Sequence, residues 1–141
     1  MIDWSALVKL IFCLDDARGV SLFGKRQSRD RYLCDNIIAD TAGITLETSA
    51  YSAKLFDTPV KIVESPSLGE DSVYFCEAVN PMQYIYDAST VVIYYWNRRY
   101  PSDVRFDTDM SELGFRLDAS EDFVGYSHEK ITKETYVRNE K

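Results

Sequence analysis

Residues 87–103 read DASTVVIYYWNRRYPSD, and the apolar run in their centre is compatible with a strand or a helix. The valine, isoleucine and tyrosine residues at 91–95 all favour strands. The same run places Ala88, Val92 and Trp96 on one face of a helix. Pro101 would end that helix, because the residue before a proline avoids helical backbone angles. The pattern therefore favours a helix over residues 87–99, with a strand as the alternative.

The opening sequence, MIDWSALVKLIFCLDDARG, predicts a helix over residues 3–18 that stops at Gly19. Its apolar residues recur at spacings of three and four, as they do on one face of a helix. A second helix is predicted over residues 29–42, with Ser28 as its N-cap. The apolar face of the first helix is formed by Trp4, Leu7, Ile11 and Leu14.

The closing stretch GYSHEKITKETY, residues 125–136, predicts a final helix that begins after Ser127, a residue type suited to the N-cap position. Strands are predicted for residues 59–64 and 72–79, and for the short segments DVRFDTD and FRLD. We expect a single domain, residues 1–141, of the α+β or α/β class. Its small mixed or antiparallel sheet would be packed with helices, with helices at both chain ends.

The negative charge of the chain is concentrated in one region. The net charge is −7, and the segment from Glu64 to Asp122 holds twelve acidic and four basic residues. Such a field repels nucleic acid and anionic membranes and attracts a cationic partner, although it also serves as a solubilising surface. The basic loop at residues 25–31 is interpreted as a solvated helix start rather than a phosphate site. We therefore expect no direct nucleic-acid or membrane partner.

The N-terminal sequence has neither the basic start of a secretory signal nor an apolar run long enough to span a bilayer. Cys13, Cys34 and Cys76 are odd in number, widely spaced and embedded in apolar runs. Buried free thiols are the favoured interpretation, and a cytoplasmic location follows from it.

His128, the only histidine in 141 residues, is the main candidate for catalysis. A general base needs a substrate proton within reach and a third group that orients the imidazole. The neighbours of His128 instead suggest the first turn of a helix, with Glu129 favoured by the positive helix end. We interpret the residue as structural. The alternative is a small enzyme in which His128 works with Glu129 or with another carboxylate that folding brings close.

Other motifs for catalysis or cofactor binding are absent from the sequence. The stretch DTDMSELGFRLD, residues 107–118, resembles a calcium loop, but it has Glu112 where such a loop needs glycine and Asp118 where it needs glutamate. No phosphate-binding glycine loop, zinc motif or nucleophile elbow is present. We therefore expect no catalytic residue, no metal and no cofactor.

Three stretches resemble a known protein family: MIDWSALVKLIFCLDDARG, ESPSLGEDSVYFCEA and EDFVGYSHEKITKETY. They are similar to immunity proteins of bacterial contact-dependent growth inhibition (CDI) systems, of the ribonuclease-toxin type. The resemblance implies a cytosolic protein that binds a cognate toxin nuclease domain and blocks it, and that has no catalytic activity of its own.

An RNA-cleaving toxin presents a cationic cleft, so the acidic segment of this chain is the expected partner-binding surface. The resemblance does not assign contact residues, and these are chosen from the charge pattern. A small adaptor that binds another basic protein is an alternative that the sequence barely separates from the first. The predicted partner-binding residues are Glu70, Asp71, Asp107, Asp109, Glu112, Glu121 and Asp122.

Overall fold

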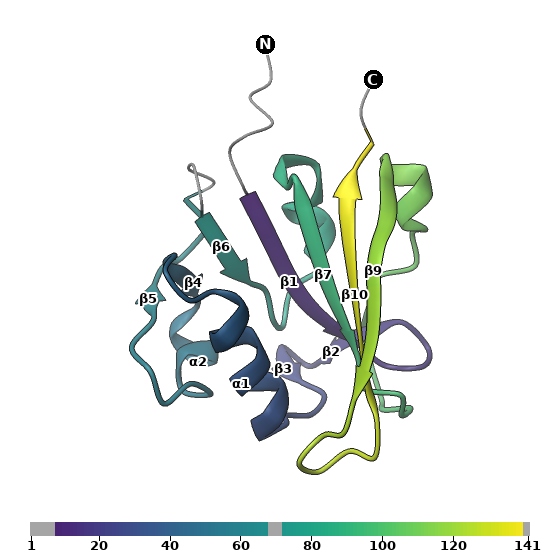
Figure 1. Cartoon of the computed structure of the whole chain (residues 1–141). Coiled ribbons are helices and arrows are strands. Elements are labelled where there is room, and N and C mark those ends of the chain that lie inside the picture. The colour runs from purple at the N-terminus through teal and green to yellow at the C-terminus, as the bar shows by residue number, and fades with distance from the viewer. Residues whose placement is uncertain (1–7, 68–71, 140–141) are drawn as a thin grey trace.

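The structure, a computed structural model, describes residues 8–67 and 72–139. Its main element is a seven-stranded mixed sheet with the strand order β5-β4-β6-β1-β7-β10-β9 (Figure 1). The first five strands in this order are parallel, and β10 runs antiparallel to both β7 and β9. The strands are β1 (Val8–Leu14), β4 (Leu46–Thr48), β5 (Lys61–Ile62), β6 (Ser72–Phe75), β7 (Thr90–Tyr95), β9 (Phe115–Phe123) and β10 (Ile131–Arg138).

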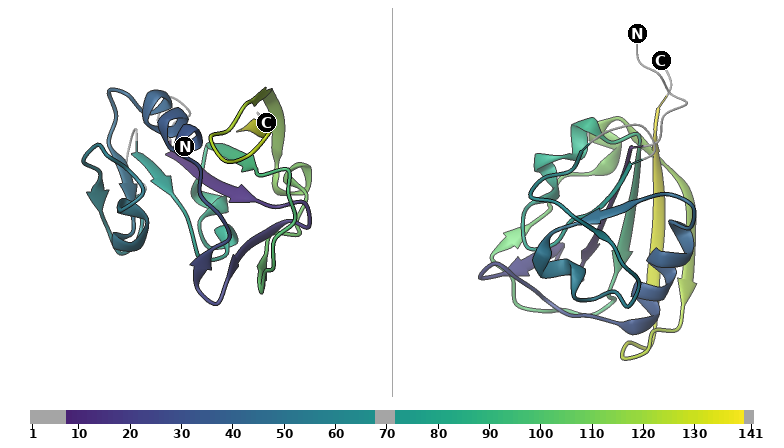
Figure 2. Two further views of the ribbon diagram at one scale, coloured as in Figure 1. Left: turned by 90° about the horizontal axis from the view of Figure 1, so that it is seen from below. Right: turned by 90° about the vertical axis from the view of Figure 1, so that its left-hand side faces the viewer.

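Short helices and a second, three-stranded sheet surround the main sheet. Figure 1 shows α1 in front of the main sheet, and the side view in Figure 2 shows it packed along one face. The small sheet has the order β3-β2-β8, with β2 (Gly19–Leu22), β3 (Lys25–Arg26) and β8 (Val104–Arg105). The helices are α1 (Arg31–Asp40) and α2 (Ala50–Ala53), with the 3-10 turns η1 (Pro81–Gln83), η2 (Ile85–Asp87) and η3 (Met110–Leu113).

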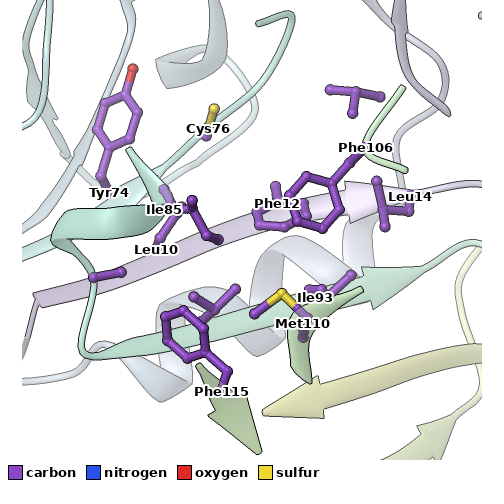
Figure 3. Packing of buried hydrophobic residues seen from close by; sticks show 13 residues of the cluster. Leu10, Phe12, Leu14, Tyr74, Cys76, Ile85, Ile93, Phe106, Met110 and Phe115 are labelled. Carbon is purple, nitrogen blue, oxygen red and sulfur yellow. The ribbon is translucent and has the colours of Figure 1, made fainter. Parts of the chain in front are cut away.

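The central strands separate two hydrophobic cores. In β1, Phe12 and Leu14 point into one core and Ile11 points into the other, as the alternation of a strand requires. The first core lies under the 3-10 turns and the small sheet, where Phe12 packs on Phe106 with ring centroids 5.1 Å apart (Figure 3). The second core is covered by α1 through Leu33. The sheet is therefore a middle layer that is buried on both faces.

Helix α1 forms where the sequence predicts a helix, but its N-cap differs. Asp30 rather than Ser28 caps it, and the Asp30 carboxylate accepts hydrogen bonds from the backbone N–H groups of Tyr32 and Leu33. Ile37, one turn beyond Leu33, continues the buried face. The end of α1 that begins at Arg31 is thereby fixed at the carboxyl edge of the sheet.

The helix predicted for residues 3–18 was wrong. Residues 8–14 form strand β1, and the predicted residues 3–7 lie outside the described part of the chain. A strand buried on both faces has apolar residues at consecutive positions, and a continuous apolar run also contains a helical stripe. The spacing of three and four in this segment therefore does not distinguish the two structures.

The helix favoured for residues 87–99 was wrong, and the strand kept as the alternative is the structure observed. The helix predicted after Ser127 was wrong as well. Thr90–Tyr95 is the strand β7, buried on both faces like β1, and its neighbour β10 covers Ile131–Arg138. Strand β10 is rich in β-branched residues, which favour extended backbone over helix. Asn97, with a φ of 57°, follows β7 and turns the chain before Pro101.

The predicted fold class was therefore wrong. Neither end of the described chain is helical, and the sheet, although mixed as one of the two predicted forms, is large, with seven strands. The strands predicted for residues 59–64 and 72–79 are present in shorter form as β5 and β6. That residues 1–141 form one domain stays a prediction.

Two further expectations concern the cysteines and the membrane. Cys34 and Cys76 are buried and Cys13 is partly buried, and all three are free thiols, as predicted. Across residues 8–67 and 72–139, every helix is too short or too polar to span a bilayer.

A buried lysine ties β10 to α1. The side chain of Lys133 is 9% exposed, and its Nζ lies 2.7 Å from Asp40 Oδ2 and 3.8 Å from Glu121 Oε1. Asp40 ends α1, and Glu121 lies on the exposed strand β9.

We predict that Asp40→Asn lowers the free energy of unfolding by about 1–3 kcal/mol, because it replaces the charged acceptor of a buried ammonium group with a neutral amide. Glu121→Gln is the matched control and should cost at most about 0.5 kcal/mol, since that pair is longer and exposed. Urea unfolding followed by circular dichroism measures both changes. Equal losses in the two variants would contradict a dominant Lys133–Asp40 pair.

Candidate functional site

The carboxyl ends of the parallel strands meet at one edge of the main sheet, the lower edge in Figure 1. In open α/β sheets, ligands bind in the crevice outside these ends. The first residues of α1 and α2 also lie at this edge, as does the loop at residues 124–130 that joins β9 to β10 (Figure 1). Polar side chains gather here in two clusters.

The first cluster is centred on the buried carboxylate of Asp30. Beyond capping α1, Asp30 Oδ1 accepts the backbone N–H of Tyr126 at 2.9 Å. Asp30 Oδ2 accepts the backbone N–H of Ser127 at 2.8 Å and faces His128 Nδ1 at 2.9 Å. One side chain thereby fixes the start of α1 against the 124–130 loop.

His128 is 3% exposed and occupies the other end of this cluster. An ionised carboxylate can only accept, so Nδ1 carries the proton that it donates to Asp30. The opposite nitrogen, Nε2, lies 2.9 Å from the hydroxyl of Tyr100 and 3.2 Å from the hydroxyl of Ser28. In the neutral imidazole, Nε2 offers a lone pair to these hydroxyls. The result is a chain of hydroxyl, imidazole and carboxylate.

Packing restricts the imidazole as tightly as hydrogen bonds do. The ring of Trp96 stacks on His128, with centroids 4.7 Å apart and planes 27° apart. Gly125 leaves the necessary space, since a Cβ there would lie 2.7 Å from Asp30 Oδ2 and 2.8 Å from the carbonyl oxygen of His128. A group held in this way has a fixed orientation before any substrate arrives.

The environment of Asp30 stabilises its charged form. Burial by itself raises the pKa of Asp30, but hydrogen bonds from the Tyr126 amide, the His128 ring and the Ser127 and Leu33 amides outweigh burial. The net effect lowers the pKa of Asp30 far below its usual range. Asp30 is therefore an anion at all physiological pH values and orients His128 rather than acting as a base itself.

The second cluster joins β3, α2 and the end of β6. The guanidinium of Arg26 binds both carboxylate oxygens of Glu77 at 3.1–3.2 Å and lies 4.1 Å from the centre of the Tyr51 ring. The hydroxyl of Ser52 donates to Glu77 Oε1 at 2.6 Å. The Glu77 side chain is 9% exposed, so this pair is largely removed from water.

A groove of about 610 Å³ runs along α1 and faces residues 54–58. Volumes of this size are typical of small-molecule sites. Its apolar wall includes Ile38 and Phe56, and at the start of α1 it reaches Asp30 and Ser127 of the first cluster. Charged side chains of both signs line it as well: Arg29, Arg31, Lys54, Asp35 and Asp57.

The thiols near these clusters are poor nucleophiles. Burial, followed by the negative charge of Glu77, raises the pKa of Cys34 to about 11 and that of Cys76 to about 12. The same two causes raise the pKa of Cys13 well above its usual value. Thiolates, the reactive form of cysteine, are therefore scarce at neutral pH.

The acids predicted to bind a partner do not form one patch with the clusters. Glu70 and Asp71 lie outside the described residues. Asp107, Asp109 and Glu112 are exposed beside β8 and in η3, where Asp109 caps the turn. Glu121 and Asp122 are exposed on β9, and Asp122 accepts the hydroxyl of Thr132. Partner binding by these residues stays a prediction.

His128 does not begin a helix, and in this respect its interpretation was wrong. It lies in the loop before β10, and its carboxylate partner is Asp30 rather than the exposed Glu129. Asp30 and His128 are 98 residues apart in sequence, so no local sequence pattern predicts their contact. Only a helix start at residue 31 would have drawn attention to Asp30, as an N-cap.

Among the described residues, no three histidine, cysteine, aspartate or glutamate side chains are grouped so as to hold a metal ion. The segment from Asp107 to Asp118 runs through η3 into β9, and a helix–loop–helix calcium site does not have this arrangement.

Comparison with known proteins identifies the fold. No protein-family model matches the chain, and no curated protein sequence does. Among solved structures, the chain is similar to a dihydrofolate reductase from Enterococcus faecalis complexed with NADP(H) and RAB-propyl. The TM-score is 0.70 at 14% sequence identity, over 96% of this chain and 98% of the reductase. A likeness at this identity establishes a fold of the dihydrofolate reductase type.

This finding corrects the predicted family. The resemblance to CDI immunity proteins of the ribonuclease-toxin type was wrong, because the chain has a fold of the dihydrofolate reductase type, with a mainly parallel sheet. The expectations that depended on it were wrong as well: a toxin nuclease domain as partner, an inhibitory function, and the absence of catalysis.

Two substitutions of Asp30 separate its two roles. Asparagine can still cap α1 but offers an N–H₂ group to donors, so Asp30→Asn should cost about 1–3 kcal/mol of unfolding free energy. Alanine leaves several buried N–H groups and the His128 ring without an acceptor, and Asp30→Ala should cost about 3–5 kcal/mol. Chemical denaturation measures both, and an alanine variant as stable as the wild type would contradict the central place of this carboxylate.

The raised thiol pKa values predict a loss of stability in alkali. Unfolded cysteines ionise near 9, whereas folded Cys34 ionises at about 11, so folding keeps a proton that the unfolded chain releases. The stabilising contribution is complete below pH 9 and disappears as the pH rises toward 11.

Thiolate absorbance at 240 nm and urea unfolding at pH 7, 9 and 10 test this behaviour. Cys34→Ala should reduce the alkaline loss of stability relative to the wild type. Equal thiolate absorbance of the folded and the urea-unfolded protein at pH 9 would show that the thiols are not protected.

Proposed function

We propose that this chain is a small enzyme that acts on a small organic molecule and uses His128 to move a proton. The observation that carries this proposal is the chain of hydrogen bonds from the Ser28 and Tyr100 hydroxyls through His128 to Asp30. A base within hydrogen-bond reach of a hydroxyl, and itself oriented by a third group, is the general signature of acid–base and nucleophilic catalysis.

Each member of this chain has a separate role. Asp30 accepts a hydrogen bond from Nδ1–H, orients the ring and stabilises the imidazolium that forms when Nε2 takes up a proton. His128 is the base through Nε2 and returns the proton as an acid. The Ser28 and Tyr100 hydroxyls are partly exposed and carry the proton between the buried imidazole and the surface.

The groove along α1 is the proposed substrate site. Asp30 and Ser127, which contact His128, line the groove, and Ser28 immediately precedes the lining residue Arg29. Phe56 and Ile38 suit an aromatic or otherwise apolar substrate body, and the charged side chains suit polar substituents. The similar reductase supports a small-molecule substrate by its name alone, since dihydrofolate is a small organic molecule.

The proposal is tested first by binding and then by turnover. A set of aromatic carboxylic acids and heterocycles is screened by thermal shift with the wild type, and compounds that bind are followed by NMR for chemical conversion. Phe56→Ala should weaken binding, because it removes part of the apolar wall of the groove. His128→Gln should lower turnover by about 10²–10⁴-fold at unchanged binding, the usual contribution of a general base.

Removing single hydroxyls tests whether Ser28 and Tyr100 carry the proton. Ser28→Ala or Tyr100→Phe should lower turnover, whereas Tyr86→Phe, which changes an exposed tyrosine in η2, should not. Turnover that is unchanged in His128→Gln, or no bound compound that is converted, would contradict the proposal.

A further inference from the structure

The similarity to a reductase complexed with NADP(H) raises the question of whether this chain can hold a nicotinamide dinucleotide. In α/β sheets such a cofactor places its pyrophosphate outside the carboxyl ends of the strands. There it meets free N–H groups at a helix N-terminus, beside a turn whose glycines admit it. The residues of this edge test each requirement.

No free helix N-terminus faces this edge within the described ranges. At the start of α1, the N–H groups of Tyr32 and Leu33 are bound by Asp30, a carboxylate that would repel phosphate. In α2, the Ser49 hydroxyl accepts the backbone N–H of Ser52. In η1, Asn80 Oδ1 accepts the backbone N–H of Met82. Each of these starts is already capped by the side chain of the chain itself.

The turn after β6 also lacks the glycines that would admit a pyrophosphate. It reads Cys76-Glu77-Ala78, without glycine, although Ala78 has a φ of 68°, in the region that favours glycine. The Ala78 carbonyl accepts the Ser21 hydroxyl from β2 at 3.3 Å, which ties the turn to the small sheet. The backbone of this turn is therefore fixed against β2, and its residues carry side chains where glycines would leave space for a pyrophosphate.

At this edge, the Glu77 carboxylate already binds the side chains that could hold a phosphate. Its carboxylate takes two groups that otherwise suit a phosphate, the guanidinium of Arg26 and the hydroxyl of Ser52. Arg26 is further held by the Tyr51 ring and by the Tyr51 carbonyl at 3.3 Å. A bidentate guanidinium pair is the geometry with which proteins bind phosphate as well as carboxylate.

We infer that Glu77 is an internal substitute for a bound anion, and that the carboxyl edge of this chain does not accept a nicotinamide dinucleotide. With Asp30, it places two fixed negative charges where a pyrophosphate would need positive partners. The enzyme proposed above therefore works without this cofactor, although the inference stands on the geometry of Glu77 and is independent of any turnover.

Direct titration of the wild type with NADPH tests the first half of the inference. Nicotinamide fluorescence and calorimetry should detect no saturable binding up to about 1 mM. One-to-one binding with a Kd below about 100 μM would overturn the inference.

Release of the Arg26 site tests the second half, with pyrophosphate as the probe and ³¹P NMR as the readout. Glu77→Ser frees Arg26 and Ser52 and should bind pyrophosphate at least about tenfold more tightly than the wild type. The double variant Arg26→Ala/Glu77→Ser should lose this gain. Glu77→Gln, which keeps the size of the side chain and removes its charge, serves if the serine variant does not fold. Folded Glu77 variants with wild-type affinity for pyrophosphate would overturn the inference.

Discussion

The Asp30 carboxylate is the constraint on which the site depends. It caps α1 and accepts hydrogen bonds from the N–H groups of Tyr126 and Ser127 and from Nδ1–H of His128. These donors come from two segments almost a hundred residues apart, and a buried carboxylate is stable only when its acceptor positions are filled in this way. The same bonds that hold the 124–130 loop under α1 also set the orientation of the imidazole. Structural and chemical roles coincide in one side chain.

The rest of the fold explains why this side chain lies where it does. A sheet buried on both faces exposes its strand ends, and the carboxyl ends of β1, β4, β6 and β7 converge on the edge where α1 begins. In many α/β proteins this edge binds anionic cofactors. Here it holds two anions of its own: Asp30, which accepts backbone N–H groups, and Glu77, which pairs with Arg26. A groove along α1 is open, with mixed polar and apolar walls that suit a small organic molecule.

Local patterns predicted some elements of the fold and missed others. Helix α1 was predictable from its single apolar face, and β5 and β6 from their strand-forming residues. The central strands β1 and β7 were mistaken for helices, because burial on both faces removes the alternation that identifies a strand. The stretches that resemble immunity proteins include β1, β6 and β10, and apolar strand sequences recur in unrelated folds. His128 was recognised as a candidate, but its pairing with Asp30 depends on tertiary structure alone.

Because His128 is the only histidine, its ring nitrogens can be observed by ¹⁵N NMR without assignment of other residues. This measurement tests directly whether Asp30 orients the imidazole. We predict that Nδ1 is protonated in the neutral ring, that Nε2 carries the free lone pair, and that Asp30→Asn abolishes this preference. A neutral ring protonated at Nε2, with Nδ1 as the free nitrogen, would contradict both the Asp30–His128 hydrogen bond and the role of His128 as a base toward Ser28 and Tyr100.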